Sequence, residues 1–177
     1  NGSGCGNEFM SEAPMARKFM LDSLEMWVRE YQVDGFRFDL MGLHDLETMH
    51  EIKARLTALR PDLFLWGEPW AAGPTPLKPV TGKDQVRGTG IGCFNDRFRD
   101  GVKGDRDGGP AGFIQAGQRK EDVRLGLEGG VHDWAVGPAE CINYFECHDN
   151  LTSWDKLLQT NPMSSEAELE QMARFAA

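Results

Sequence analysis

The sequence predicts an α/β fold in which about four strands and five helices alternate along 177 residues. Apolar stripes at helical spacing are separated by short apolar or aromatic runs that suit strands. A strand–helix–strand unit with short connections lies between residues 33 and 66, and such units usually pair their strands in parallel. Acidic residues follow three of the strand-like runs, and this pattern favours a parallel barrel, whose functional groups come from strand ends.

The first half of the chain contains the clearest elements. Pro14, which is tolerated in a first helical turn, starts a helix whose apolar stripe fades near Gln32. Residues 33–39 are short, aromatic and alternating, as expected for a strand. Asp45 can cap a second helix, which a following proline ends. Residues 63–66 form a compact apolar run that is typical of a buried strand.

The second half is less regular and contains two glycine-rich stretches. Residues 71–90 and residues 104–140 are predicted to be long loops, which are often functional. The other predicted elements are a strand over 91–94, a helix from Asn95, a strand over 141–147, and helices over 151–158 and 166–175.

This set of elements accounts for only part of a barrel. A closed (β/α)8 TIM barrel takes about 250 residues, so we expect residues 1–177 to form one partial barrel domain. An incomplete barrel has two unpaired sheet edges and an unfinished core. We therefore expect that the rest of the same polypeptide completes the barrel and that the isolated chain is inactive.

Composition excludes several classes of partner. A net charge of −9 disfavours nucleic acid but not a neutral polymer. No apolar run approaches the ~20 residues that cross a bilayer, so no membrane partner is expected. No signal peptide is visible, which leaves a cytoplasmic or a secreted location open. Four cysteines without CxxC or histidine spacing are expected to be buried thiols: Cys5, Cys93, Cys141 and Cys147.

The first candidate acid is Asp39. Arg37 and Asp39 are two residues apart in a strand, so they point to one face, while the flanking phenylalanines point to the other. A charged pair on the inner face of a barrel strand is costly unless it is paired and used. The guanidinium favours an ionised carboxylate, the form that can attack an anomeric carbon. The alternative is a structural ion pair at a strand end.

Glu68 follows the next strand among aromatic neighbours. Trp66, Pro69 and Trp70 flank it, and apolar surroundings disfavour the charged form of a carboxyl. A carboxyl that keeps its proton suits a general acid. The indole of Trp70 suits either core packing or stacking on a sugar ring.

A third polar group follows the last predicted strand. Asp149 can stabilise positive charge in an oxocarbenium-like transition state. His148 can donate to a sugar hydroxyl, although a structural role is equally open. Asn150 begins a glycosylation sequon, which we discount because a glycan would cover this site. Two carboxylates and an acidic helper suit the hydrolysis of a glycosidic bond.

These motifs resemble the alpha-amylase superfamily of glycoside hydrolases, and most closely the type I pullulanases. Residues 33–42 (VDGFRFDLMG), 67–70 (GEPW) and 146–155 (ECHDNLTSWD) resemble that family's segments around barrel strands four, five and seven. With further matches at 4–7, 11–14 and 94–100, the resemblance covers nearly the whole chain. It implies that about strands four to seven are present, while the family's strand-three segment and strand eight have no counterpart.

The resemblance also implies roles. Asp39 would be the nucleophile, Glu68 the general acid/base and Asp149 the transition-state stabiliser. Arg37 would orient Asp39, and His148 would bind the sugar in the cleavage subsite, with Trp70 as a further substrate contact. The implied reaction is retaining hydrolysis of α-1,6 branches in pullulan, amylopectin and limit dextrins, with the two main carboxylates about 5–5.5 Å apart.

No cofactor is implied, and no calcium site is identified, although a structural calcium ion stays open. The implied partner is a branched α-glucan. Two alternatives remain, an isoamylase-type glycogen debranching enzyme and a non-catalytic glucan-binding homologue. The residues after Asp39 and Asp149 favour the pullulanase form over the first, and the presence of all three acids disfavours the second.

Overall fold

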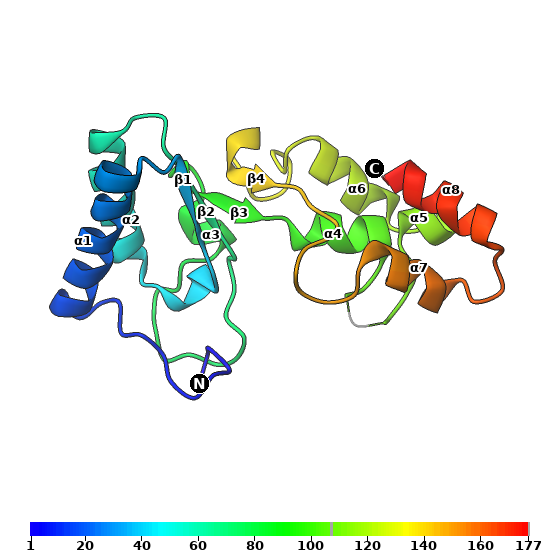
Figure 1. Ribbon diagram of the computed structural model, residues 1–177, viewed down its shortest axis with the longest axis horizontal. Coiled ribbons are helices and arrows are strands. Elements are labelled where there is room, and N and C mark those ends of the chain that lie inside the picture. Colours follow the sequence, from blue (N-terminus) through cyan, green and yellow to red (C-terminus); the bar gives the residue numbers. More distant parts are fainter. Residues whose placement is uncertain (107, 177) are drawn as a thin grey trace. The chain divides into compact units, whose positions relative to one another are not determined.

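The computed structural model describes residues 1–106 and 108–176; Asp107, which is part of the predicted loop 104–140, and Ala177 lie outside the described residues. The fold is α/β, and four strands alternate with helices in the described part of the chain (Figure 1). In chain order the elements are α1 (Pro14–Tyr31), β1 (Gly35–Phe38), η1 (Met41–Leu43), α2 (Leu46–Leu59), β2 (Phe64–Gly67), α3 (Lys83–Val86), β3 (Gly92–Phe94), α4 (Asp96–Lys103), α5 (Phe113–Ala116), α6 (Lys120–Leu127), η2 (Pro138–Glu140), β4 (Cys141–Ile142), α7 (Ser153–Thr160) and α8 (Glu166–Ala176).

The chain divides into two compact units. The first comprises Asn1–Phe94 with Trp134–Glu140, and the second comprises Asn95–Asp133 with Cys141–Ala177. The prediction that residues 1–177 form one partial barrel domain stays a prediction, and the two units are described separately.

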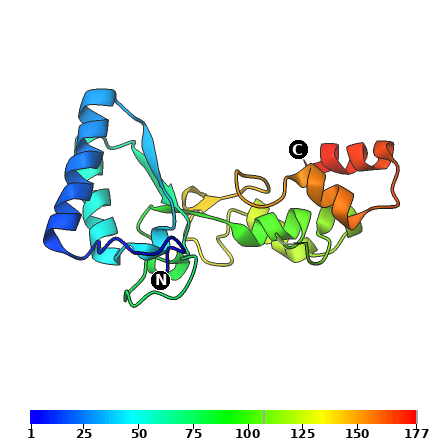
Figure 2. The same ribbon diagram turned by 60° about the horizontal axis from the view of Figure 1, so that its bottom comes forward.

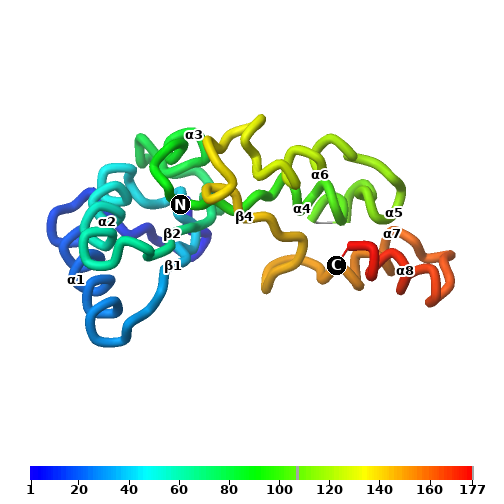
Figure 3. The backbone as a smooth tube through the Cα atoms, turned by 90° about the horizontal axis from the view of Figure 1, so that it is seen from above, coloured from blue at the N-terminus to red at the C-terminus, as the bar shows by residue number. Residues whose placement is uncertain are grey.

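The first unit is built on three parallel strands. Strand β1 pairs with β2 in parallel, from Gly35 opposite Phe64 to Phe38 opposite Gly67, and β2 pairs in parallel with β3. Helices α1 and α2 contact each other and lie side by side along one face of this sheet (Figures 1, 2 and 3). The predicted strand–helix–strand unit is therefore confirmed.

Apolar residues from the strands and both helices form the core of this unit. Because successive side chains of a strand point to opposite faces, Phe38 and Leu65 point towards the helices. Both are buried there, with 8% and 0% of their surface exposed. Arg37 and Asp39 consequently point to the opposite face of the sheet. The helices contribute Leu21 and Val28 from α1, and Met49, Ile52 and Leu56 from α2.

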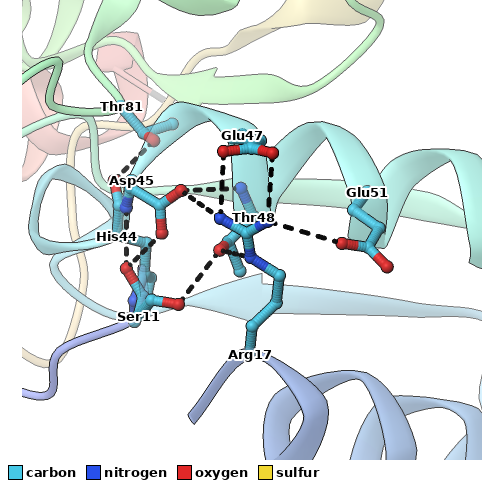
Figure 4. A network of polar contacts seen from close by, with 8 residues as sticks. All are labelled: Ser11, Arg17, His44, Asp45, Glu47, Thr48, Glu51 and Thr81. Carbon is cyan, nitrogen blue, oxygen red and sulfur yellow. Dashed lines mark hydrogen bonds and ion pairs between the residues drawn. The ribbon is translucent and has the colours of Figure 1, made fainter. Parts of the chain in front are cut away.

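Asp45 caps α2 as predicted and also ties it to α1. Its Oδ1 accepts the Thr48 backbone N–H at 2.9 Å, while the Ser11 hydroxyl donates to Oδ2 at 2.6 Å. Arg17 of α1 approaches Oδ1 to 3.2 Å (Figure 4). One buried carboxylate therefore begins the second helix and fixes its start against the first.

The second unit is mainly helical. Helix α4 contacts α5, α6 and α7, and α8 contacts α5 and α7. Its core cluster consists of Val102, Ile114, Leu157 and Leu169.

Two predicted loops contain helices. Helix α3 lies within 71–90, and α5, α6 and η2 lie within 104–140. Each has only one or two turns, which is too short for apolar periodicity to stand out among glycines. Few apolar side chains of these helices are buried; they include Val86 of α3, Ile114 of α5 and Leu125 of α6.

The predicted strand over 141–147 is wrong beyond Ile142. At the next residue, the Asn143 side chain bonds to partners far away in the chain: its Nδ2 donates to the Gly126 carbonyl at 2.7 Å, and its Oδ1 accepts from Asn95 at 3.1 Å. Asparagine side chains compete with sheet pairing in this way.

The prediction of four buried cysteines is also wrong in part. Cys93 is buried and Cys141 is half-buried, but Cys5 and Cys147 are exposed. The two exposed thiols lie in irregular segments, outside the helices and strands. No helix in the described part of the chain is long and apolar enough to cross a membrane.

We predict that Asp45→Asn destabilises the fold more at neutral than at acid pH. Burial alone would raise the pKa of Asp45, but hydrogen bonds from Ser11 and Thr48 and the charge of Arg17 outweigh it and lower the pKa below its usual value. Such a group stabilises the fold above its unfolded pKa of about 3.9 and loses that contribution as the pH falls towards the folded pKa.

The substitution should lower the free energy of unfolding by about 1–3 kcal/mol near pH 7. Urea unfolding at a series of pH values should show this difference shrinking below about pH 4. Asp62→Asn, at an exposed site, is the matched control and should have no measurable effect. A difference for Asp45→Asn that stays constant down to the acid limit would contradict the prediction.

Candidate active site

Parallel pairing brings two of the predicted acids together. Strands β1 and β2 end in register at Phe38 and Gly67, and Asp39 and Glu68 are the next residues. The Glu68 backbone N–H donates to the Phe38 carbonyl at 3.1 Å, so the two chains still pair where the acids begin. Both carboxylates therefore stand at the carboxyl edge of the sheet.

Arg37 contacts both carboxylates. Its Nη1 forms an ion pair with Asp39, and its Nη2 lies 2.9 Å from Glu68 Oε1. The guanidinium also lies 5.6 Å from the centre of the Phe94 ring on β3. The predicted contact with Asp39 is confirmed, whereas the contact with Glu68 was not anticipated. The planar guanidinium fork can serve two carboxylates at once.

Strand register could have revealed the second contact. Arg37 is opposite Trp66, and Glu68, two residues further along, points to the same face. A guanidinium is long enough to reach this diagonal neighbour.

The two carboxylates differ in exposure. The Glu68 side chain is 8% exposed, whereas the Asp39 side chain is 70% exposed. Burial of Glu68 agrees with its apolar sequence context, but the expected aromatic enclosure is wrong in detail. Trp66 stacks on Phe64 with ring centres 5.0 Å apart. A cation and a backbone N–H, that of Leu40 at 2.6 Å from Oε2, contact the Glu68 carboxylate instead.

The turn after β1 is strained. Leu40 adopts the left-handed conformation with φ 40° and ψ 51°, which costs a residue with a side chain about 1–2 kcal/mol. This conformation accompanies the hydrogen bond from its N–H to Glu68. Strain of this kind persists where surrounding contacts enforce it, and it clusters at functional sites.

Gly42 allows the loops after β1 and β2 to approach closely. Its N–H lies 3.2 Å from the Glu68 carbonyl and 3.1 Å from the Trp70 carbonyl. A Cβ at this position would lie 2.5 Å from the Trp70 carbonyl carbon, so no larger residue fits. Trp70 itself is half-buried, and its contact with substrate stays a prediction.

The third predicted acid lies in the second unit. Asp149 and His148 stand in the connection between β4 and α7, with His148 Nε2 3.6 Å from Asp149 Oδ2. Both side chains are more than half exposed, and Asn150 adopts a left-handed φ of 65°. The structure thus pairs His148 with Asp149. That this pair joins Asp39 and Glu68 in one site stays a prediction.

Within residues 1–106 and 108–176, no group of three or more His, Cys, Asp and Glu side chains is arranged to hold a metal ion. The described contacts of the candidate site are instead ion pairs and hydrogen bonds among its own residues. Such a set of carboxylates beside a cation can carry out proton transfer and nucleophilic attack.

We predict that Arg37→Met lowers the free energy of unfolding by about 3–5 kcal/mol at neutral pH, because it removes the cation from a buried carboxylate. Adding Glu68→Gln should recover part of this loss, and urea unfolding of the single and double variants measures the coupling. Asp39→Asn is the matched control, since it removes the exposed partner of the same guanidinium and should cost less than about 1 kcal/mol. Equal losses for Arg37→Met and Asp39→Asn would refute the prediction.

Comparison with known proteins identifies the relatives of this chain. No protein-family model matches it. The pullulanase of Bacillus subtilis strain 168 is 40% identical over 186 residues, which cover 100% of this chain and 26% of that protein. The solved pullulanase of Bacillus acidopullulyticus matches with a TM-score of 0.95 and 46% identity, over 99% of this chain and 22% of that one.

The pullulanase of Paenibacillus barengoltzii, solved in complex with maltohexaose and alpha-cyclodextrin, matches with a TM-score of 0.89 and 42% identity, over 99% of this chain and 29% of that one. An isoamylase, SU1 of Zea mays, is 37% identical, but over only 90 residues and 50% of this chain.

This chain spans about a quarter of the length of the pullulanases that it matches. The similarity confirms the predicted fold class, α/β and part of a TIM barrel. The chain is a homologue, over its whole length, of a segment of the type I pullulanases in the alpha-amylase family.

Proposed function

We propose that the complete polypeptide hydrolyses α-1,6-glucosidic branches in pullulan, amylopectin and limit dextrins by retaining double displacement. The observation that carries this proposal is the contact of one guanidinium, Arg37, with both Asp39 and Glu68. A retaining mechanism needs two carboxyl groups about 5–5.5 Å apart. A guanidinium that contacts both carboxylates holds them within the reach of its two terminal nitrogens, and this neighbourhood supports a retaining pair.

Asp39 is proposed as the nucleophile. Its carboxylate is the more exposed of the two, so a sugar can reach it, and its ion pair with Arg37 holds it beside Glu68. Attack on the anomeric carbon forms a covalent glycosyl ester with Asp39, while Glu68 protonates the departing glycosidic oxygen.

Glu68 is proposed to change role between the two steps. After giving its proton to the departing oxygen it is a carboxylate, and it can then accept a proton from the water that hydrolyses the Asp39 ester. Hydrolysis releases the sugar and restores the Asp39 carboxylate, while Arg37 contacts both groups throughout.

The remaining predicted residues are proposed to hold the substrate. Asp149 stabilises positive charge at the anomeric centre, and the adjacent His148 donates to a sugar hydroxyl. Trp70 offers an aromatic face to a sugar ring. The reaction consumes only water and needs no cofactor, and a neutral branched α-glucan is compatible with a net charge of −9. The bound maltohexaose of the Paenibacillus barengoltzii enzyme supports an α-glucan as the substrate class.

We predict that Asp39→Asn in the complete polypeptide lowers kcat for maltotriose release from pullulan by at least about a thousandfold, because an amide cannot form the glycosyl ester. Asp34→Asn is the matched control, since it changes an exposed aspartate just before the same strand and should retain full activity. Undiminished release of maltotriose by Asp39→Asn would show that Asp39 is not the nucleophile. Rapid cleavage of glycogen with slow cleavage of pullulan would favour the isoamylase-type alternative, and glucan binding without hydrolysis would favour the non-catalytic one.

A separate prediction concerns Glu68. Glu68→Gln should slow the hydrolysis of pullulan at least about a hundredfold, because the departing sugar oxygen needs a proton. A substrate with a nitrophenol leaving group needs little protonation, so formation of its glycosyl ester should be slowed much less. Measuring the burst of nitrophenol and the pullulan rate side by side checks this difference. If Glu68→Gln lowered the rate of pullulan hydrolysis and the rate of the nitrophenol burst equally, Glu68 would not be the general acid.

A further inference from the structure

Helix α4 carries two buried cations on one face. Arg99 is 7% exposed and Lys103 is 1% exposed, and their spacing of four residues places them one turn apart. A buried cation is costly unless its hydrogen bonds are satisfied, and an apolar side chain of similar length would fill the same space without that cost. The hydrogen-bond partners of Arg99 and Lys103 therefore indicate which part of the chain the two side chains hold in place.

Both cations contact the segment that carries His148 and Asp149. Arg99 Nη1 donates to the Tyr144 hydroxyl at 2.9 Å, before the pair, and Lys103 Nζ donates to the Leu151 carbonyl at 2.8 Å, after it. One helix face thus holds both ends of the segment 144–151.

A third contact closes the same loop. The Ser153 hydroxyl, at the start of α7, donates to the Glu146 carboxylate across the loop. Thr152 caps α7 by accepting the Asp155 backbone N–H at 3.1 Å, which fixes where the loop ends. The predicted site residues Asp149 and His148 therefore stand on an exposed loop whose two ends are held by hydrogen bonds, two of them from the buried cations of α4.

The charges around Lys103 come from α4 and from this loop. Burial, and next the charge of Arg99, lower the pKa of Lys103, while Cys147, Glu146 and Asp100 oppose that shift. The ammonium thus lies in surroundings that disfavour its charge and makes a short hydrogen bond to a loop carbonyl. Burial raises the pKa of Tyr144 to about 12, so its hydroxyl stays protonated and can accept from Arg99.

We propose that Lys103 is a positioning residue that acts through the Leu151 carbonyl to fix the loop carrying Asp149. The proposal rests on the proposed function, because it assumes that Asp149 stabilises the transition state. Such a group must be held within about 0.5 Å of its working position. Asp149 is exposed on a loop, next to the left-handed Asn150. Its carboxylate can keep a fixed position only if other side chains hold the backbone of that loop.

The chain offers a matched control in Lys156. This lysine of α7 is 0% exposed, and its Nζ donates to the Gly109 carbonyl at 3.1 Å. Lys103 and Lys156 are thus equally buried and both bind a backbone carbonyl. They differ in the segment that they hold, since Gly109 lies outside the loop of Asp149.

The experiment compares Lys103→Met with Lys156→Met in the complete polypeptide, with pullulan as substrate. We expect Lys103→Met to lower kcat about 10- to 100-fold, as a displacement of about 1 Å does, with KM changed less than about threefold. Hydrogen–deuterium exchange should become faster in peptides that cover residues 147–152. Lys156→Met should leave kcat within about twofold and exchange in that loop unchanged, even if both variants melt at lower temperature.

Several results would overturn the proposal. These are a kcat within twofold of the parent for Lys103→Met, unchanged exchange in 147–152, or equal losses of kcat in both variants. If Lys103→Met does not fold, Lys103→Gln keeps a polar side chain that is too short to make the same bond to the Leu151 carbonyl; unchanged exchange in the same peptides would then refute the proposal.

The exchange readout also separates this proposal from the proposed function. Full activity of Asp149→Asn would refute the role of that acid. Faster exchange of its loop in Lys103→Met would still show that Lys103 holds the loop.

Discussion

The guanidinium of Arg37 contacts the carboxylates of both Asp39 and Glu68, and the ends of β1 and β2 with the loops that follow them are arranged around this contact. The contact requires β1 and β2 to be parallel and in register, because only then do both acids reach the same edge of the sheet. It also requires the loops that follow to approach closely, which the left-handed Leu40 and the side-chain-free Gly42 permit. The local strain at Leu40 is offset by the hydrogen bond that it makes with Glu68.

The two faces of the sheet in the first unit carry different kinds of side chain. On one face, apolar side chains of α1, α2 and the strands form a dry core. On the other face, charged groups stand at the strand ends, and the buried one, Glu68, is tolerated because it has the Arg37 guanidinium and the Leu40 N–H as partners. The polar network of Asp45 belongs to the structural side, since it fixes the starts of the two covering helices against each other. A rigid support of this kind is what a precisely spaced pair of carboxylates needs.

The second unit uses buried charge in a different way. Arg99 and Lys103 extend from α4 into its interior and bind a hydroxyl and a carbonyl of one loop, so the hydrogen bonds define that loop rather than add apolar stability. In both units, a cationic side chain thus contacts the segment that carries a candidate acid, and this cation is half-buried in the first unit and buried in the second. In the first unit the cation binds the acids directly, and in the second it binds the backbone beside them.

The sequence by itself determined the long helices, the first two strands and the cap at Asp45, because periodicity and capping are local properties. The ion pair of Arg37 with Asp39 also follows from their spacing in one strand, while the catalytic roles of the candidate acids stay predictions. It did not reveal the short helices within 104–140 or the early end of β4, since a few residues carry too little pattern and Asn143 is committed by distant partners. Only the tertiary structure showed that Glu68 meets a cation instead of an aromatic enclosure, and that Lys103 is buried beneath the loop of Asp149. Both facts depend on contacts between side chains that are far apart in the sequence. Local sequence spacing does not determine such contacts; the tertiary fold does.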